Sequence, residues 1–161
     1  MARPSFALAW KAFQDVRIPV ADVGRLIGGK VQQNIDAGIF QNACPIRMSY
    51  VLNKTGFPIP AGTKYAAVTG ADKQRYMFRV NDMMEYLESK FGRPEKSARS
   101  PRPSDFAGMN GILLVKGSGW QNARGHVTLW NGSLCADSCH LAQDPDNGTF
   151  IPEVASLWTL R

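Results

Sequence analysis

The sequence predicts an α+β fold in which N-terminal helices pack on an antiparallel β-sheet. Two observations support this. Apolar residues recur at helical spacing in the first half of the chain, and two strand-like segments, 111–117 and 126–130, follow each other in the second half. The length of 161 residues is ordinary for one domain and sufficient for a hydrophobic core. We therefore expect residues 1–161 to form a single domain.

Two helices are predicted near the N-terminus. Ser5 can cap the first helix, because its hydroxyl can accept a hydrogen bond from the free N–H groups of the first turn. The second helix begins near Val20. Their apolar positions include Phe6, Leu8, Ala9, Trp10 and Phe13 in the first helix and Val23, Leu26 and Ile27 in the second. We expect both helices to be scaffold.

A third helix is predicted over residues 45–54, directly after Cys44. Pro45 is favoured at the first position of a helix, and Gly56 with Pro58 provides a stop signal. Cys44 is therefore expected at a helix N-terminus. The free N–H groups and positive dipole end found there favour a thiolate and offer donors to an oxyanion.

A fourth helix is predicted from Asn81, as its cap, through Phe91, with Gly92 as its stop. The segment 93–103 that follows is rich in proline, serine and cations. We expect it to be a solvated, mobile loop, and gripping an anionic substrate is an alternative role for it.

Two neighbouring strands are predicted in the second half. Segment 111–117 is a continuous apolar run and should be buried on both faces. Side chains of segment 126–130 alternate between the two faces of a predicted strand, and the segment ends in the turn signal Asn131-Gly132. The two should pair in antiparallel fashion, and the connection between them carries Trp120, which we expect to line a cleft.

The three cysteines divide into a pair and a single residue. Cys135 and Cys139 are four residues apart and can bridge, whereas Cys44 is distant. A leftover thiol beside a plausible disulfide is a candidate nucleophile. The alternative is that Cys44 is a small buried apolar residue, as most free cysteines are.

A nucleophilic cysteine needs a base, and the chain has two histidines. His126 begins a predicted strand and is the stronger candidate; the alternative is a structural histidine. His140 lies in a predicted loop and is the weaker candidate.

Asp137 lies between Cys135 and Cys139, and a carboxylate held against His126 Nδ1 would set the tautomer of the ring. A bridge that closes so short a ring adds little stability, so we interpret it as a local clamp on Asp137.

A zinc site is the main competing hypothesis for these residues. Cys135, Cys139, His140 and His126 have the ligand types that zinc prefers. However, adjacent residues such as Cys139 and His140 rarely both reach one ion, and a zinc site leaves Cys44 unexplained.

The sequence resembles a known family. The segments 40–50 and 119–132, together with Cys135, Asp137 and Cys139, are similar to the fourth family of type VI secretion peptidoglycan amidase effectors. The resemblance continues through residues 79–82, 104–106, 144–148 and 152–154 and so covers essentially the whole chain.

This resemblance implies a papain-like cysteine amidase, with residues 1–161 as one catalytic domain. It implies cleavage of peptidoglycan stem peptides between γ-linked D-glutamate and meso-diaminopimelate. Cys44, His126 and Asp137 match the nucleophile, base and orienting acid of the family, and Cys135 with Cys139 matches its disulfide. It also implies a secretion apparatus and a cognate immunity protein as partners. The oxyanion donors are expected to be the Cys44 N–H and a side chain just upstream, Gln41 or Asn42.

Charge and composition agree with this interpretation. The net charge of +6 suits an anionic polymer, and the sequence lacks the motifs typical of nucleic-acid binding. No cofactor is expected. Insertion into a membrane is not expected either, since no apolar segment is long enough to span one. No secretory signal is recognisable, yet a disulfide is expected. Synthesis in the producer cytoplasm followed by injection into the periplasm of a target bacterium resolves that conflict.

The alternative function is a non-enzymatic cell-wall or protein-binding module with a buried Cys44.

Overall fold

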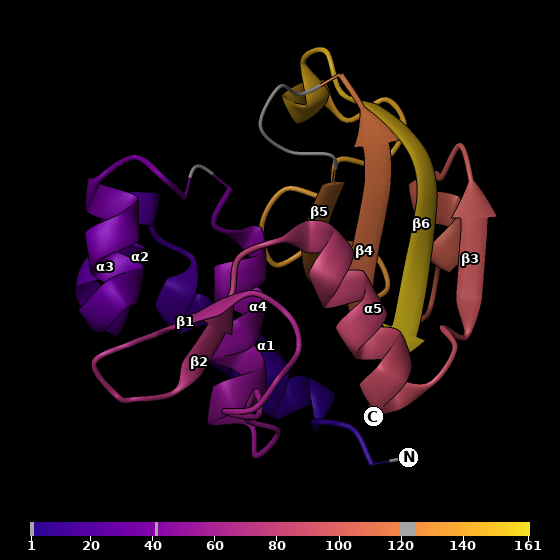
Figure 1. Ribbon diagram of the computed structural model, residues 1–161. Coiled ribbons are helices and arrows are strands. Elements are labelled where there is room, and N and C mark those ends of the chain that lie inside the picture. The colour runs from indigo at the N-terminus through magenta and orange to yellow at the C-terminus, as the bar shows by residue number, and fades with distance from the viewer. Residues whose placement is uncertain (1, 41, 120–124) are drawn as a thin grey trace.

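The computed structural model describes residues 2–40, 42–119 and 125–161, and it confirms the α+β class. Figure 1 shows helices gathered at one end of a four-stranded sheet, with one further helix lying across the sheet. The α-helices are α1 (Phe6–Val16), α2 (Val20–Ile27), α3 (Gly29–Asp36), α4 (Cys44–Lys54) and α5 (Val80–Phe91). The strands are β1 (Ala67–Thr69), β2 (Arg75–Met77), β3 (Lys96–Arg99), β4 (Gly111–Ser118), β5 (Gly125–Trp130) and β6 (Ile151–Thr159). Two short 3₁₀ helices cover Pro103–Phe106 and Pro145–Asn147.

The predicted helices α1, α2 and α4 are present. Ser5 caps α1, because its hydroxyl oxygen accepts a hydrogen bond from the Leu8 N–H at 3.4 Å. The predicted cap of α5 was wrong, since the helix begins at Val80 after Arg79 and Asn81 lies within its first turn. Helix α3 and the small β1–β2 hairpin were not predicted.

The main sheet has the strand order β3-β6-β4-β5, and all its strands are antiparallel to their neighbours. Strands β4 and β5 pair as predicted, with Val115 opposite His126 and Leu113 opposite Thr128. Strand β6, which was not predicted, lies on the other side of β4. β5 therefore forms one edge of the sheet, and this is the edge beside α4 (Figure 1).

The segment 93–103 is not simply the solvated loop that its composition predicts. Residues Lys96–Arg99 form the edge strand β3, which pairs with β6. Backbone hydrogen bonds supply this pairing, so the exposed polar side chains do not prevent it. Lysine and arginine are common on edge strands because charge discourages further strand addition.

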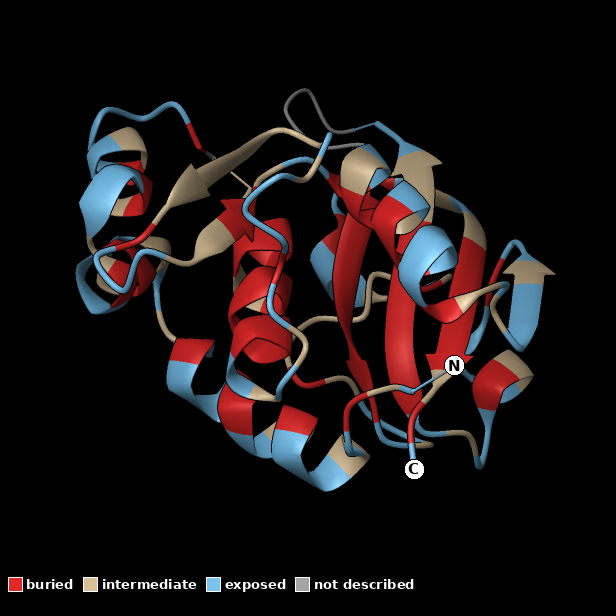
Figure 2. Cartoon of the chain, turned by 60° about the horizontal axis from the view of Figure 1, so that its bottom comes forward, coloured by how far each residue is buried: buried red, intermediate tan, exposed pale blue. Residues whose placement is uncertain are grey.

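The hydrophobic core covers both faces of the sheet. Val127 and Leu129 belong to a large cluster that includes residues of α1, α4 and α5, and Leu113, Val115 and Trp130 belong to a second cluster on the opposite face. Figure 2 shows α4 and the central strands as the most deeply buried elements. Burial of this kind fixes α4 against β5, and so fixes the distance between the residues that they carry. No helix formed by the described residues is long and apolar enough to cross a membrane.

Candidate active site

Cys44 is the first residue of α4, as the sequence predicts. Pro45 follows it in the first turn, and the preceding Ala43 provides no side-chain cap. Cys44 is the free cysteine of the chain, and its exposed fraction is 1%. Burial alone is as consistent with an unreactive structural thiol as with a catalytic one. Its neighbours therefore decide what Cys44 can do.

One of those neighbours is His126, the second residue of β5. Its residue exposure is 7%, and the Cys44 side chain is close enough to raise the pKa of its imidazole. The two residues come from elements that the core packs together, α4 and β5. The buried thiol is therefore paired with a potential base, which is the arrangement that cysteine nucleophiles require.

The chain after β5 brings Asp137 to the same place. Asn131 begins a tight turn, in which its side-chain oxygen accepts hydrogen bonds from the N–H groups of Ser133 and Leu134. The chain then returns beside the free edge of β5, where Trp130 forms an isolated antiparallel bridge with Cys135 and the Ala136 N–H donates to the Leu129 carbonyl. Continuing this register places Asp137 beside Thr128, on the same face of β5 as His126.

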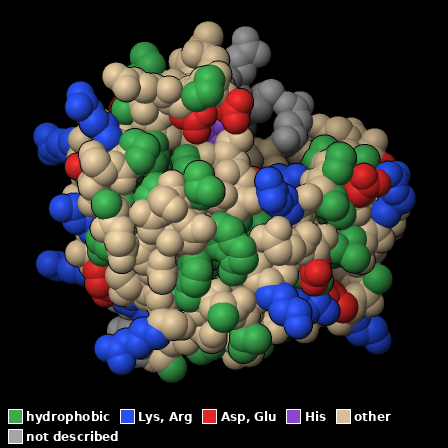
Figure 3. Space-filling model, turned by 180° about the vertical axis from the view of Figure 1, so that it is seen from behind, with side chains coloured by type: hydrophobic (Ala, Val, Ile, Leu, Met, Phe, Trp, Pro, Cys, Tyr) green, Lys and Arg blue, Asp and Glu red, His purple; other side chains and the backbone are tan. Residues whose placement is uncertain are grey.

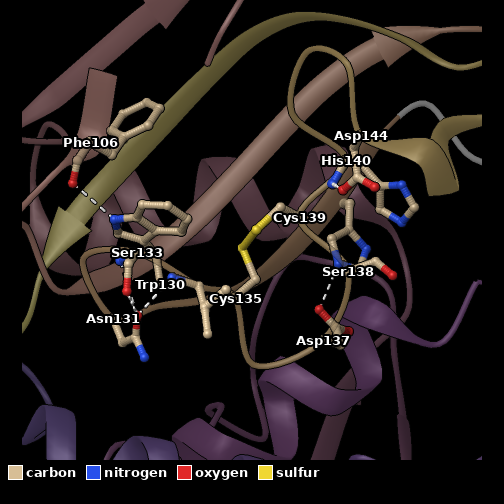
Figure 4. The surroundings of a disulfide bond; sticks show 12 residues. Phe106, Trp130, Asn131, Ser133, Cys135, Asp137, Ser138, Cys139, His140 and Asp144 are labelled. Atoms are coloured by element: carbon tan, nitrogen blue, oxygen red, sulfur yellow. Dashed lines mark hydrogen bonds and ion pairs between the residues drawn. A yellow bond between two sulfur atoms is a disulfide. The ribbon is translucent and has the colours of Figure 1, made fainter. Parts of the chain in front are cut away.

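The predicted disulfide is present, and it closes the loop that carries Asp137. Cys135 and Cys139 are bonded, with their Cα atoms 5.4 Å apart (Figure 4). They pack against the second core cluster. Because both sulfurs are in the bridge, they are not available as zinc ligands, and the described residues contain no cluster suited to a metal.

The prediction that Asp137 would contact His126 Nδ1 was wrong. Asp137 Oδ1 lies 2.9 Å from His126 Nε2, so Asp137 engages the other ring nitrogen from the one predicted. The physical reason is the path of the chain. The returning segment runs along the edge of β5, whereas Cys44 lies at the start of α4, so the acid and the thiol reach the ring from different elements.

Burial and charge shift the pKa values of this pair in opposite directions. Burial lowers the pKa of His126, but the charge of Asp137 and the hydrogen bonds with Asp137 and Cys44 outweigh it and raise the value to about 10. Burial likewise raises the pKa of Asp137, but the charge and hydrogen bond of His126 bring it below its usual value. The site therefore favours a carboxylate beside an imidazolium.

Two further residues stabilise the Asp137 carboxylate, and the sequence analysis missed both. Thr128, which is fully buried, lies near enough to Asp137 to lower the pKa of that carboxyl, although its hydroxyl oxygen makes no well-formed hydrogen bond with any described residue. The charge of Arg47 acts in the same direction. Arg47 is held by hydrogen bonds to the carbonyls of Val16 and Ile18, at the end of α1. Strand alternation was the available signal for Thr128, since it lies two residues after His126.

His140 lies close to the site without replacing His126 as the base. The two imidazole rings meet edge to face with centroids 4.7 Å apart. His140 Nδ1 lies 3.1 Å from Asn147 Oδ1, and its backbone N–H donates to Asp144. Burial lowers the pKa of His140, and the charge of His126 lowers it further. His140 is therefore best suited to pack against the His126 ring as a neutral side chain.

A pocket of about 460 Å³ opens beside His126 and Asp137. Figure 3, which views the molecule from behind, shows a histidine at the bottom of a hollow beside acidic side chains. The pocket is also lined by Arg17, Ile18, Pro19, Arg47, Ser138 and His140.

The remaining predicted site residues divide into two groups. Gln41 and Trp120 lie outside the described residues. Asn42 is described, and both of its polar groups are engaged. Its Oδ1 accepts a hydrogen bond from the Cys44 N–H at 3.1 Å, and its Nδ2 donates to the Gly125 carbonyl at 3.3 Å. The N–H expected to receive an oxyanion is thus occupied in this structure.

Comparison with known proteins identifies the family. The family model described as type VI secretion system amidase effector protein 4, or Tae4, matches residues 40–157, which include Cys44, His126 and Asp137. The chain belongs to the Tae4 family. It is therefore a peptidoglycan amidase effector, as the sequence resemblance predicts.

Solved Tae4 structures agree over almost the entire chain. The Tae4 effector of Salmonella typhimurium, solved with the immunity protein Tai4 of Enterobacter cloacae, is 61% identical with a TM-score of 0.96. The Tae4 effector of Enterobacter cloacae, solved with Tai4, is 56% identical with a TM-score of 0.96. Each comparison covers 99% of this chain and 100% of the other. A comparison with curated protein sequences gave no significant match.

Proposed function

We propose that this Tae4 protein is a cysteine amidase that cleaves the bond between γ-linked D-glutamate and meso-diaminopimelate in peptidoglycan stem peptides. The observation that carries the proposal is the arrangement of Cys44, His126 and Asp137 in a chain of an amidase family. A thiol, an imidazole and a carboxylate in this order supply a nucleophile, a base and an orienting acid.

Catalysis begins with the Cys44 sulfur. His126 takes the thiol proton through the nitrogen that faces Cys44, and the thiolate attacks the carbonyl carbon of the γ-glutamyl amide. Asp137, bonded to Nε2, holds the ring in position and stabilises the imidazolium that forms. The high pKa of His126, about 10, keeps that proton on the ring near neutral pH.

The second half of the reaction uses the same proton. The tetrahedral intermediate expels the diaminopimelate amine, which His126 protonates as it leaves, and an acyl-enzyme remains on Cys44. Water, deprotonated by His126, then releases the D-glutamyl product and restores the thiol. The developing oxyanion is assigned to Gln41 as the side-chain candidate, because the Cys44 N–H already donates to Asn42 Oδ1.

The proposed setting follows from the redox chemistry of the site. A chain made in the producer cytoplasm holds reduced cysteines, and the Cys135–Cys139 bridge would form after injection into the periplasm of a target cell. The secretion apparatus and a cognate immunity protein are the proposed partners. The Tae4 relatives solved with Tai4 support the second of these.

Digestion of purified peptidoglycan followed by mass analysis of the fragments tests the proposal. We expect new N-terminal amines on meso-diaminopimelate and new carboxyl groups on D-glutamate. Intact glutamyl–diaminopimelate bonds, with cleavage elsewhere in the stem, would contradict the assigned bond. The same assay with untreated and alkylated protein tests the assigned nucleophile.

The alkaline limit of the proposed reaction should depend on Asp137. Because the charge of Asp137 raises the pKa of His126, Asp137→Asn should lower that pKa, so His126 loses its proton at a lower pH than in the wild type. Titration of the histidine NMR signals measures this directly, with His140→Gln used to assign the two rings. An unchanged His126 titration in Asp137→Asn would contradict the electrostatic coupling.

Thr128→Val tests the contact between the Thr128 hydroxyl and Asp137. Valine keeps the shape of the side chain and removes the hydroxyl, which helps to keep the pKa of Asp137 low. We expect activity to fall roughly tenfold or more. The melting temperature should change little, because the buried hydroxyl has no hydrogen-bond partner among the described residues that valine would leave unsatisfied. Thr128→Ser is the matched control and should keep most of the activity.

A further inference from the structure

Asn42 makes one hydrogen bond beside each of the two central residues of the proposed site. Its Oδ1 accepts from the backbone N–H of Cys44, and its Nδ2 donates to the carbonyl of Gly125, the residue directly before His126. Asn42 and Gly125 are 83 residues apart in the sequence. One side chain therefore ties the start of α4 to the start of β5.

The β5 end of this connection is rigidly placed. Gly125 is buried and pairs with Lys116 of β4. A Cβ atom at Gly125 would lie 2.5 Å from the Val115 carbonyl oxygen and 3.0 Å from Val80 Cγ1. The backbone of Gly125 is thus closely surrounded, so its carbonyl is a fixed acceptor for Asn42.

At the α4 end, Asn42 supplies a hydrogen-bond partner that the helix itself does not provide. The Ala43 side chain cannot cap the helix, and the Cys44 N–H is one of the first-turn donors that lack a partner within the helix. Asn42 provides that partner. Loss of Asn42 would leave the buried Cys44 N–H without this partner, at the residue that carries the sulfur.

We infer that Asn42 is a positioning residue that sets the geometry between the Cys44 thiol and the His126 imidazole by joining their backbones. The inference rests on the proposed cysteine mechanism. It assigns Asn42 a role different from donating to the oxyanion, because its hydrogen bonds run to the backbones of Cys44 and Gly125. Reactions between positioned groups are sensitive to shifts of about 1 Å, so a small movement of α4 is sufficient to slow the reaction.

Two substitutions separate the connection from a purely local turn. Asn42→Ala removes both hydrogen bonds. Asn42→Ser keeps a short side-chain acceptor for an N–H two residues ahead but is too short to span to Gly125. If the connection matters, serine should behave like alanine; if only the local turn matters, serine should behave like the wild type.

Asn53 offers a matched control at the other end of α4. Its Nδ2 donates to the Arg75 carbonyl and its Oδ1 accepts from the Ile59 N–H, so it also joins two backbone segments. It is remote from Cys44 along the helix. Asn53→Ala should therefore lower the melting temperature without changing the reactivity of Cys44 in the folded protein.

The test measures the alkylation rate of Cys44 by iodoacetamide, the kcat and KM of peptidoglycan hydrolysis, and the melting temperature. We expect Asn42→Ala and Asn42→Ser each to lower the alkylation rate and kcat about tenfold, because both lose the hydrogen bond to Gly125 that joins the two backbones, and we expect KM to change little. Wild-type alkylation and turnover in Asn42→Ser would overturn the inference. An equal loss in Asn53→Ala would also overturn it, since general loosening would then explain the effect.

The alkylation measurement needs no substrate, so it separates this inference from the proposed function. A wild-type protein that alkylates rapidly but does not cleave peptidoglycan would contradict the proposed substrate alone. A wild-type protein that cleaves peptidoglycan, combined with unaffected alkylation in both Asn42 variants, would contradict the positioning role alone.

Discussion

Cys44→Ala is expected to reduce peptidoglycan hydrolysis by about 10⁴-fold or more while the protein remains folded. The substitution removes the proposed nucleophile, and no other described thiol is free to replace it. The stability effect should be small by comparison, about 1 kcal/mol, because only one buried sulfur atom is lost. Release of stem-peptide fragments and thermal unfolding measure the two effects separately.

Cys44→Ser and a core variant complete this experiment. Serine retains the approximate size of cysteine but ionises far less readily, so we expect nearly the same loss of activity. Met48 is fully buried on the same helix, and Met48→Leu conserves its volume, so this control should retain activity with a stability change below about 1.5 kcal/mol. Normal turnover by a folded Cys44→Ala protein would end the cysteine mechanism.

Local sequence signals predicted the parts of the site that depend on local structure. Pro45 and the stop at Gly56 placed Cys44 at the start of a helix, and α4 begins at Cys44. Alternation placed Val127 and Leu129 on one face and Trp130 on the other, and they pack in two separate core clusters. These features depend on a few neighbouring residues, so the sequence carries them directly.

Long-range pairing was harder to predict, because it depends on which edges remain open in three dimensions. The polar strand β3 has no hydrophobic pattern, yet β6 holds it through backbone hydrogen bonds. The same limit applies to His126, since the spacing of Asp137 did not reveal which imidazole nitrogen it would meet. Asn42 is the clearest example of a contact that the sequence did not reveal, because its second hydrogen-bond partner, Gly125, lies far away in the sequence.

The disulfide depends both on local sequence spacing and on long-range contacts. Four-residue spacing made the bridge between Cys135 and Cys139 feasible, and the structure confirms it. Its role as a clamp depends on what the enclosed loop contacts. Asp137 meets His126 Nε2, and His140, which follows Cys139 directly, packs against the same imidazole. The bridge therefore restrains two side chains that contact the proposed base.

Asp137→Asn is expected to reduce turnover by about 10⁴-fold with a smaller effect on substrate binding, because the imidazole loses the charge that stabilises its protonated form and the asparagine NH2 group can favour the wrong tautomer of the ring. The paired Cys135→Ser and Cys139→Ser variant should act in the same direction but less strongly, since Asp137 remains and only its position is released. Steady-state kinetics on soluble stem-peptide fragments separate kcat from KM. Full activity in Asp137→Asn would remove this residue from the proposed triad.

Melting temperatures of the paired serine variant decide whether the bridge is a clamp or a stability element. In the chain-entropy model a ring this short contributes only about 2 kcal/mol, which corresponds to roughly 5 °C for a domain of this size. If the bridge chiefly positions Asp137, activity should fall at temperatures where the variant is still fully folded, and reduction of the wild-type disulfide should reproduce that loss. A collapse of folding would instead assign the bridge to stability, because Cys135 and Cys139 also pack against the second core cluster. Full activity in a folded serine variant would show that the Asn131 turn and the pairing beside β5 hold Asp137 without the bridge.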